Sequence, residues 1–154
     1  SFIIDEGYKR GMSIVLNPSP INEKIFECDL EKVEYLILNE IEAADILGAS
    51  DTGEDELIEK LTKKFPGMKI VLTLGEKGSV YVDKTQKIRQ EIYKADVVDT
   101  TAAGDTFTGY FIAGIVAGID VAGALKQAAK AASITVSRKG ASPSIPFYRE
   151  VCER

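Results

Sequence analysis

Residues 99–109 read Asp-Thr-Thr-Ala-Ala-Gly-Asp-Thr-Phe-Thr-Gly and lead directly into an apolar segment rich in glycine and alanine. Small residues just before a helix leave several backbone N–H groups open, and the helix dipole adds positive potential at the same point. The stretch therefore predicts a helix whose first turn suits an anion, such as a transferring phosphoryl group. Asp105 lies in this turn, where its carboxylate could cap the helix or accept a proton from an attacking hydroxyl.

Apolar runs and helical patterns alternate along the rest of the chain. Buried strands are expected over 13–17, 34–38 and 69–74, and a turn at Asp83-Lys84 joins two further strands over 79–82 and 87–93. Helices are expected up to Gly11, over 42–47 and 54–65, from the quoted stretch to about Gly118, and over 121–136. This alternation predicts an α/β fold with a mainly parallel sheet.

Polar and small residues lie at or just after several of the expected strand ends. They are Asn17, Asn39, Thr73, Gly75 and Asp99. In open parallel sheets, ligands bind beyond the carboxyl ends of the strands. We therefore expect these residues to share one edge of the sheet.

Each local motif also has a purely structural interpretation. In Asn39-Glu-Ile-Glu42, the carboxylate of Glu42 could hold the water shell of Mg²⁺, or Asn39 could simply cap a helix. The glycines of residues 73–78 could let backbone N–H groups approach a phosphate, or could form an ordinary hairpin turn. The loop over 138–144 could wrap a cation with its carbonyl groups, or could be a solvated loop after a helix. Taken singly, the first two motifs favour the structural interpretation.

Composition excludes several classes of function. The 154 residues suggest one domain, and the formal net charge of −5 without a cluster of Lys or Arg argues against nucleic acid as a partner. The chain contains no histidine, so acid–base chemistry must fall mainly to Asp or Glu. No apolar run reaches membrane-spanning length and no signal peptide is recognisable. Cys28 and Cys152 fit reduced thiols, so a cytoplasmic location is expected.

Five motifs occur in an order that strongly resembles the C-terminal part of ribokinase-like sugar kinases. They are Asn-Pro-Ser-Pro (17–20), Asn-Glu-Ile-Glu-Ala (39–43), Thr-Leu-Gly-Glu-Lys-Gly (73–78), Asp-Thr-Thr-Ala-Ala-Gly-Asp-Thr-Phe (99–107) and Arg-Lys-Gly-Ala-Ser-Pro-Ser-Ile-Pro (138–146). The resemblance covers nearly the whole chain. It implies a three-layer α/β/α, Rossmann-like fold in which residues 1–154 form the ATP-binding and catalytic part. It also implies ATP-dependent phosphorylation of a sugar hydroxyl, with ribose as the preferred acceptor.

The resemblance implies roles for individual residues. Asp105 matches the family's catalytic base, and the backbone N–H groups of Ala102, Ala103 and Gly104 match its anion hole. Glu42 matches the acid that holds Mg²⁺ through water. The residues that match the ATP site are Asn39, Thr73, Gly75, Glu76, Lys77, Gly78, Gly104 and Ala129. The residues that match an activating K⁺ site are Asp99, Thr101, Thr135, Arg138, Gly140 and Ser144.

The N-terminal half of the family pattern has no counterpart among these residues. In the family, that half carries most sugar contacts and a β-strand lid that serves in closure and often in dimerisation. The resemblance thus implies an open apolar sheet edge, a homodimer when full length, and little sugar phosphorylation by this chain alone. A kinase for another sugar or a nucleoside, and a non-catalytic nucleotide-binding module, remain as alternatives.

Overall fold

The computed structural model describes residues 2–49 and 52–152. The chain divides into two compact units. Unit 1 comprises Ser1–Gly75 and Val80–Ile88, and unit 2 comprises Glu76–Ser79 and Arg89–Arg154. The boundary between them therefore runs through the turn after the third strand, which is one of the motifs quoted above.

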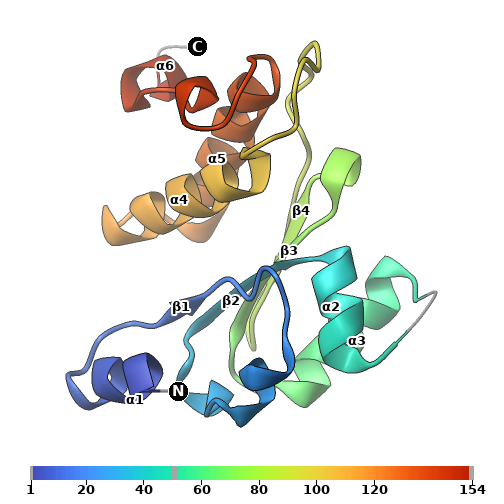
Figure 1. Cartoon of the computed structure of the whole chain (residues 1–154), viewed down its shortest axis with the longest axis vertical. Coiled ribbons are helices and arrows are strands. Elements are labelled where there is room, and N and C mark those ends of the chain that lie inside the picture. Colours follow the sequence, from blue (N-terminus) through green and yellow to red (C-terminus); the bar gives the residue numbers. More distant parts are fainter. Residues whose placement is uncertain (1, 50–51, 153–154) are drawn as a thin grey trace. The chain divides into compact units, whose positions relative to one another are not determined.

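A five-stranded sheet runs in the order β1-β2-β3-β4-β5 (Figure 1). The strands are β1 (Val15–Leu16), β2 (Tyr35–Asn39), β3 (Lys69–Thr73), β4 (Ser79–Val82) and β5 (Lys87–Gln90). The first three are parallel to one another, and Asn39 at the end of β2 is directly opposite Thr73 at the end of β3. The α/β class is confirmed, and these two strand ends share one edge, as the sequence predicts. Asp99, which was expected beside them, does not follow a strand, because β5 already ends at Gln90, and it belongs to unit 2.

The core of unit 1 lies between this sheet and two helices, α2 (Glu40–Leu47) and α3 (Glu54–Lys64). Leu36 and Leu38 of β2 and Ile70 and Leu72 of β3 are almost completely buried, and Leu61 of α3 is fully buried in the same cluster. Such continuous apolar strands are typical of parallel sheets with covered faces.

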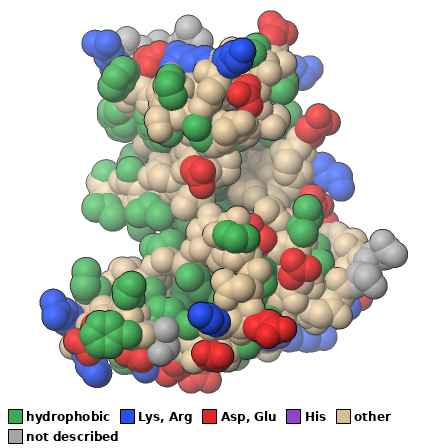
Figure 2. All heavy atoms as spheres, viewed as in Figure 1, with side chains coloured by type: hydrophobic (Ala, Val, Ile, Leu, Met, Phe, Trp, Pro, Cys, Tyr) green, Lys and Arg blue, Asp and Glu red, His purple; other side chains and the backbone are tan. Residues whose placement is uncertain are grey.

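The N-terminal helix α1 (Phe2–Lys9) packs only partly on the rest of unit 1 and has no buried residue. Lys32, in the short helix η2 (Leu30–Lys32), forms an ion pair of 2.5 Å with Asp5. Phe2 and Ile3 are 76% and 85% exposed, and hydrophobic side chains are visible over this helix in Figure 2. The adjoining strand β1 is an edge strand of the sheet.

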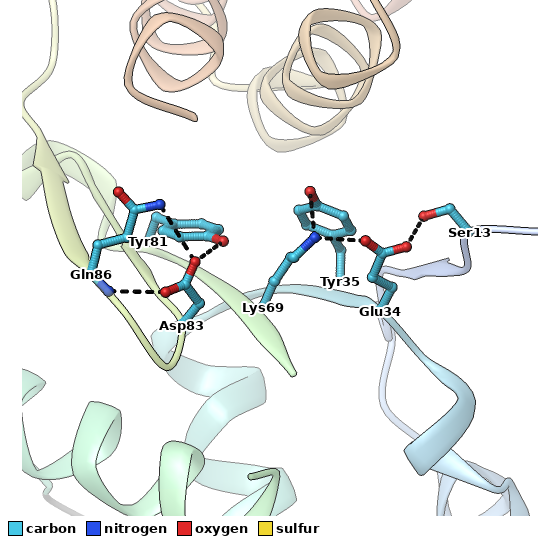
Figure 3. A network of polar contacts seen from close by, with 7 residues as sticks. All are labelled: Ser13, Glu34, Tyr35, Lys69, Tyr81, Asp83 and Gln86. Atoms are coloured by element: carbon cyan, nitrogen blue, oxygen red, sulfur yellow. Dashed lines mark hydrogen bonds and ion pairs between the residues drawn. The ribbon is translucent and has the colours of Figure 1, made fainter. Parts of the chain in front are cut away.

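A polar network joins the amino ends of β2 and β3 (Figure 3). The ammonium of Lys69 lies 2.6 Å from the carboxylate of Glu34 and 4.6 Å from the centre of the Tyr35 ring. The hydrogen bond from Lys69 lowers the pKa of Glu34 below its ordinary value, with a further contribution from the Ser13 hydroxyl. This network lies at the strand ends opposite Asn39 and Thr73, so we assign it a structural role.

Asp83 closes the hairpin between β4 and β5 (Figure 3). Its carboxylate accepts hydrogen bonds from the Tyr81 hydroxyl at 2.6 Å, from the Thr85 N–H at 2.6 Å and from the Gln86 N–H at 2.9 Å. Burial raises the pKa of Asp83, but these hydrogen bonds outweigh burial and hold that pKa well below its ordinary value.

The Asp83 hairpin predicts a specific acid sensitivity. Because the folded pKa of Asp83 is lowered, its stabilising effect is present above the unfolded pKa of about 3.9 and is lost as the pH falls below it. The Asp83→Asn variant should therefore show a smaller loss of unfolding free energy than the wild type between pH 5 and pH 2.5, measured by urea denaturation. Asp55→Asn, which removes an exposed partner of Lys87, is the control. An Asp83→Asn variant that loses as much stability as the wild type would contradict the assignment.

Unit 2 consists mainly of two packed helices, α4 (Ala103–Val116) and α5 (Val121–Val136). A Cβ atom placed on Gly114 of α4 would lie only 3.0 Å from the Cβ of Ala124 on α5. Ala124, Ala128 and Ala131 are completely buried. The alanine-rich sequence of α5 thus allows a close approach of the two helices. The short segments η4 (Ser142–Ser144) and α6 (Tyr148–Cys152) complete the unit.

The outer face of α4 remains exposed. Gly109, Ala113 and Val116 are exposed, and 82% of Val116 is accessible to solvent. These residues share one helical face with Asp105, because residues four and seven apart lie above one another. A helix that is apolar on nearly all sides is usually buried on all sides, so α4 is unusual in leaving this face uncovered.

Several element bounds differ from the expected ones. The first strand is reduced to Val15–Leu16, and β5 ends at Gln90 rather than at residue 93. Helix α2 begins at Glu40 rather than Glu42, because Asn39 serves as its N-cap. The 3₁₀ turn η1 (Glu23–Glu27), η2, η4 and α6 were not expected from the sequence, since such short helices lack a clear apolar period.

Candidate active site

The N-terminus of α4 begins in an unusual backbone conformation. Ala102, its N-cap residue, has a φ of 63°, and it is the non-glycine residue with a positive φ in the described chain. This left-handed conformation costs an L-residue about 1–2 kcal/mol. Within the described residues, no side chain caps α4. The N–H groups of its first turn therefore have no side-chain acceptor, and the helix dipole places positive potential at the same point. This arrangement suits an external anion.

Asp105 lies in the first turn of α4 and is exposed. It does not cap the helix, so of the two roles that the sequence left open, capping is not the one adopted. The backbone N–H of Ala103, one of the three expected anion-hole donors, bonds to the Thr100 carbonyl at 3.2 Å. By contrast, Asp120 does cap α5, since its carboxylate accepts a hydrogen bond from the Gly123 N–H at 2.7 Å.

Asp99 joins the segment before α4 to the loop after α5. One carboxylate oxygen accepts a hydrogen bond from the Thr101 N–H and the other from the Gly140 N–H, both at 2.9 Å. Hydrogen bonds from the hydroxyl and N–H of Thr101, together with that from Gly140, lower the pKa of Asp99 to about 2. The N–H groups of Val98 and Asp99 both bond to the Val136 carbonyl, at 2.8 and 3.1 Å. Three of the six expected cation-site residues are thus in direct contact.

The other three expected cation-site residues lie at the end of α5, in the loop that follows it and in η4. The Thr135 carbonyl accepts a hydrogen bond from the Arg138 N–H at 3.1 Å, while the Arg138 side chain pairs with Glu150 at 2.5 Å. Ser144 is completely buried and donates its hydroxyl proton to the Ala141 carbonyl at 2.6 Å. The atoms here that could bind a cation are all oxygen atoms. Hard cations such as K⁺ are bound by the oxygen atoms of carbonyl groups.

In unit 1, Asn39 and Glu42 form a reciprocal capping box on α2. The Asn39 side chain accepts a hydrogen bond from the Glu42 N–H, and the Glu42 carboxylate accepts one from the Asn39 N–H, both at 2.9 Å. Glu42 is only 8% exposed. Asn39 therefore caps the helix, as the structural interpretation of this motif predicts, and one carboxylate oxygen of Glu42 already accepts a hydrogen bond. Nearby, the Thr73 hydroxyl is 3.4 Å from the Leu38 carbonyl.

No group of three or more acidic or thiol side chains that could hold a metal ion occurs among residues 2–49 and 52–152. A magnesium site at Glu42 would thus rest on one carboxylate and on waters or phosphate oxygens. That arrangement suits Mg²⁺, which usually keeps several waters and takes one or two carboxylates.

The turn after β3 is built on two glycines with positive φ. Gly75 has a φ of 55°, and Gly78 has a φ of 88°. A Cβ atom on Gly78 would lie 2.1 Å from the carbonyl oxygen of Gln90, so only glycine fits there. Glu76 and Lys77 between them are exposed. Of the two remaining expected nucleotide contacts, Ala129 is buried in α5 and Gly104 is exposed in the first turn of α4.

Arg89 is a residue that the sequence analysis missed. One of its guanidinium nitrogens donates a hydrogen bond to the Lys77 carbonyl at 3.1 Å. The alternation in β5 places Arg89 on the exposed side of the strand. No sequence pattern, however, connects it with a carbonyl twelve residues earlier.

A family model described as "pfkB family carbohydrate kinase" matches residues 7–147. The chain belongs to this family. The pfkB-family chain is 38% identical over 144 residues to a ribokinase of Staphylococcus aureus (strain COL), a match that covers 92% of this chain and 47% of the relative.

Solved structures show the same relationship. The pfkB-family chain matches the structure of Arabidopsis thaliana ribokinase complexed with ribose and ATP with a TM-score of 0.85 and 32% identity, over 98% of this chain and 50% of that one. A putative ribokinase II of E. coli in complex with ATP and Mg²⁺ matches with a TM-score of 0.81 over 96% of this chain and 50% of that one. At 22% identity, this second match supports the fold alone.

These comparisons confirm the ribokinase-like α/β fold. The pfkB-family chain spans about half the length of the curated relatives it matches. Among the residues described, no helix is both long and apolar enough to cross a membrane.

Proposed function

We propose that the chain is the C-terminal, ATP-binding and catalytic part of an ATP-dependent sugar kinase, with ribose as the acceptor. The observation that carries this proposal is the N-terminus of α4, which has no side-chain cap and holds an exposed Asp105 in its first turn. Asp105 neither caps the helix nor is buried, and no side chain caps the N–H groups beside it. This arrangement combines a proton acceptor with an anion site. Membership of the pfkB carbohydrate kinases supports the reaction class.

In the proposed reaction, the carboxylate of Asp105 accepts the proton of a sugar hydroxyl. The hydroxyl oxygen then forms a bond to the γ-phosphorus of ATP, and the bond to the bridging oxygen of ADP breaks. The backbone N–H groups of Ala102, Ala103 and Gly104 stabilise the charge on the transferring phosphoryl group, and the Ala103 N–H exchanges its bond with the Thr100 carbonyl for one with a phosphoryl oxygen. Ribose is proposed because the relatives named above are ribokinases, one of which was solved with ribose and ATP.

The proposed nucleotide contacts come from Asn39, Thr73 and the turn at Gly75–Gly78, with Ala129 beside the base. Glu42 would hold Mg²⁺ through its waters, and the bound ion would neutralise charge on the phosphates. K⁺ would be held by the carboxylate of Asp99, the hydroxyl of Ser144 and the carbonyls of Thr101, Thr135, Arg138 and Gly140. By fixing the segment before Ala102, that cation site would control the backbone geometry of the anion hole.

Titration calorimetry with Mg-ATP tests the nucleotide part of this proposal, and Glu42 provides a matched pair of variants. Glutamine can complete the capping box, so Glu42→Gln should leave the unfolding free energy within about 0.5 kcal/mol of the wild type. It removes the charge, so the affinity for Mg-ATP should fall about 10- to 100-fold. Glu42→Ala should lose the affinity and, in addition, about 1 kcal/mol of stability.

The same titration in K⁺ buffer and in tetramethylammonium buffer tests the cation site. Binding should be tighter in K⁺. Wild-type protein that is folded but takes up no Mg-ATP in either buffer would contradict the proposed nucleotide site. A Glu42→Gln variant that binds Mg-ATP like the wild type would remove Glu42 from it.

A further inference from the structure

Arg89 is the last exposed residue of β5, and its side chain reaches back to the turn before β4. Its guanidinium donates a hydrogen bond to the Lys77 carbonyl at 3.1 Å. Lys77 is itself exposed, in the part of the turn that belongs to the same compact unit as Arg89. The bond therefore joins two segments that are separated along the chain but belong to one unit.

A second contact acts on the neighbouring residue of the turn. The backbone of Gly78 packs directly on Gln90 and Glu91, since a Cβ atom at Gly78 would lie 2.1 Å from the Gln90 oxygen and 2.9 Å from the Glu91 Cα atom. Residues 89–91 thus fix two consecutive residues of the turn, one through a side chain and one through the backbone.

A turn with a left-handed glycine has high conformational freedom, which a ligand must remove when it binds. A turn held in its bound shape beforehand avoids part of that entropic cost. An exposed hydrogen bond of this kind contributes little to global stability, but it can decide the shape of a short loop. An arginine suits this role because its planar fork loses less freedom for each hydrogen bond formed.

We propose that Arg89 is a positioning residue for nucleotide binding, which holds the Lys77 carbonyl and so keeps Lys77 and Gly78 in the shape that receives ATP. This inference rests on the proposed function, because it takes the turn as part of the nucleotide site. Arg89 acts through the turn and is not assigned a contact with the nucleotide.

Calorimetric titration of Mg-ATP into the wild type, Arg89→Ala and Arg89→Lys tests the inference. Arg89→Ala should raise the dissociation constant about 5- to 10-fold, the effect of losing one exposed hydrogen bond of ordinary strength. Arg89→Lys should recover part of the affinity, since its ammonium can donate to the same carbonyl. Lys87→Ala is the matched control, because Lys87 is an exposed cation on the same side of the same strand and pairs with Asp55. It should bind Mg-ATP like the wild type.

Amide hydrogen exchange of residues 76–79 without nucleotide gives a second readout. Arg89→Ala should accelerate exchange there, and Lys87→Ala should not. The inference is overturned if Arg89→Ala binds Mg-ATP like the wild type, or if Lys87→Ala weakens binding equally, which would indicate a general charge effect. If folded wild type binds no Mg-ATP at all, the proposed function fails and the inference fails with it. If the wild type binds Mg-ATP normally but the Arg89→Ala result contradicts the inference, the inference fails alone and the proposed function is not affected.

Discussion

Asp105→Asn in the complete kinase domain is expected to lower kcat about 10²- to 10⁴-fold, the usual contribution of a general base. Asparagine is nearly the same size as aspartate but cannot accept the proton of the sugar hydroxyl. Because Asp105 is exposed and does not cap α4, neither the unfolding free energy nor the affinity for Mg-ATP should change appreciably. Steady-state kinetics, calorimetry and urea denaturation on the same preparation measure the three quantities.

Asp120 provides the matched control for Asp105. Each residue lies at the start of a helix in unit 2, but only Asp120 accepts a hydrogen bond from its own helix, at 2.7 Å from the Gly123 N–H. Asp120→Ala should lose about 1 kcal/mol of stability while kcat is retained. If Asp105→Asn instead lost stability and kept its kcat, the carboxylate would be serving the helix and not the reaction.

Gly78→Ala is expected to lower the unfolding free energy by about 2–4 kcal/mol. Alanine is strained at a φ of 88°, and its Cβ would overlap the Gln90 carbonyl oxygen, which is backbone and cannot rotate away. Urea denaturation of the wild type and the variant measures the loss.

Gly75→Ala separates the two causes of that loss. Gly75 also has a positive φ, of 55°, but a Cβ atom there would meet nothing within 4 Å. Only the conformational cost of about 1–2 kcal/mol should therefore appear. Equal losses in the two variants would show that the contact with Gln90 is relieved by a shift of the hairpin.

The sequence alone was sufficient to predict the α/β class, a mainly parallel sheet and the placement of Asn39 and Thr73 at strand ends on one edge. The strands follow from apolar runs, which are formed by residues close together in the chain. The shared edge then follows from the general geometry of parallel sheets. The cap at Asn39 was also predictable, since a capping box needs only residues three apart. The contact of Asp99 with Gly140 was implied by a family resemblance and by no local pattern.

The missed features depend on contacts between distant segments or on backbone conformation. The left-handed φ of Ala102 has no signal in its residue type, because alanine rarely adopts this conformation. The bond from Arg89 to the Lys77 carbonyl requires a hairpin of known register. The exact length of β1 depends on pairing along the strand, which an edge position in the sheet leaves weakly specified.

The outer face of α4 also limits how concentrated a solution of this chain can be. The charge of −5 keeps identical molecules apart at long range, but physiological salt screens that repulsion beyond about 8 Å. At shorter range, contact between the exposed Ala113 and Val116 of two molecules would bury apolar surface, and sulfate strengthens such apolar burial. The chain should therefore stay dispersed best in dilute, low-salt buffer, and ammonium sulfate should precipitate it early.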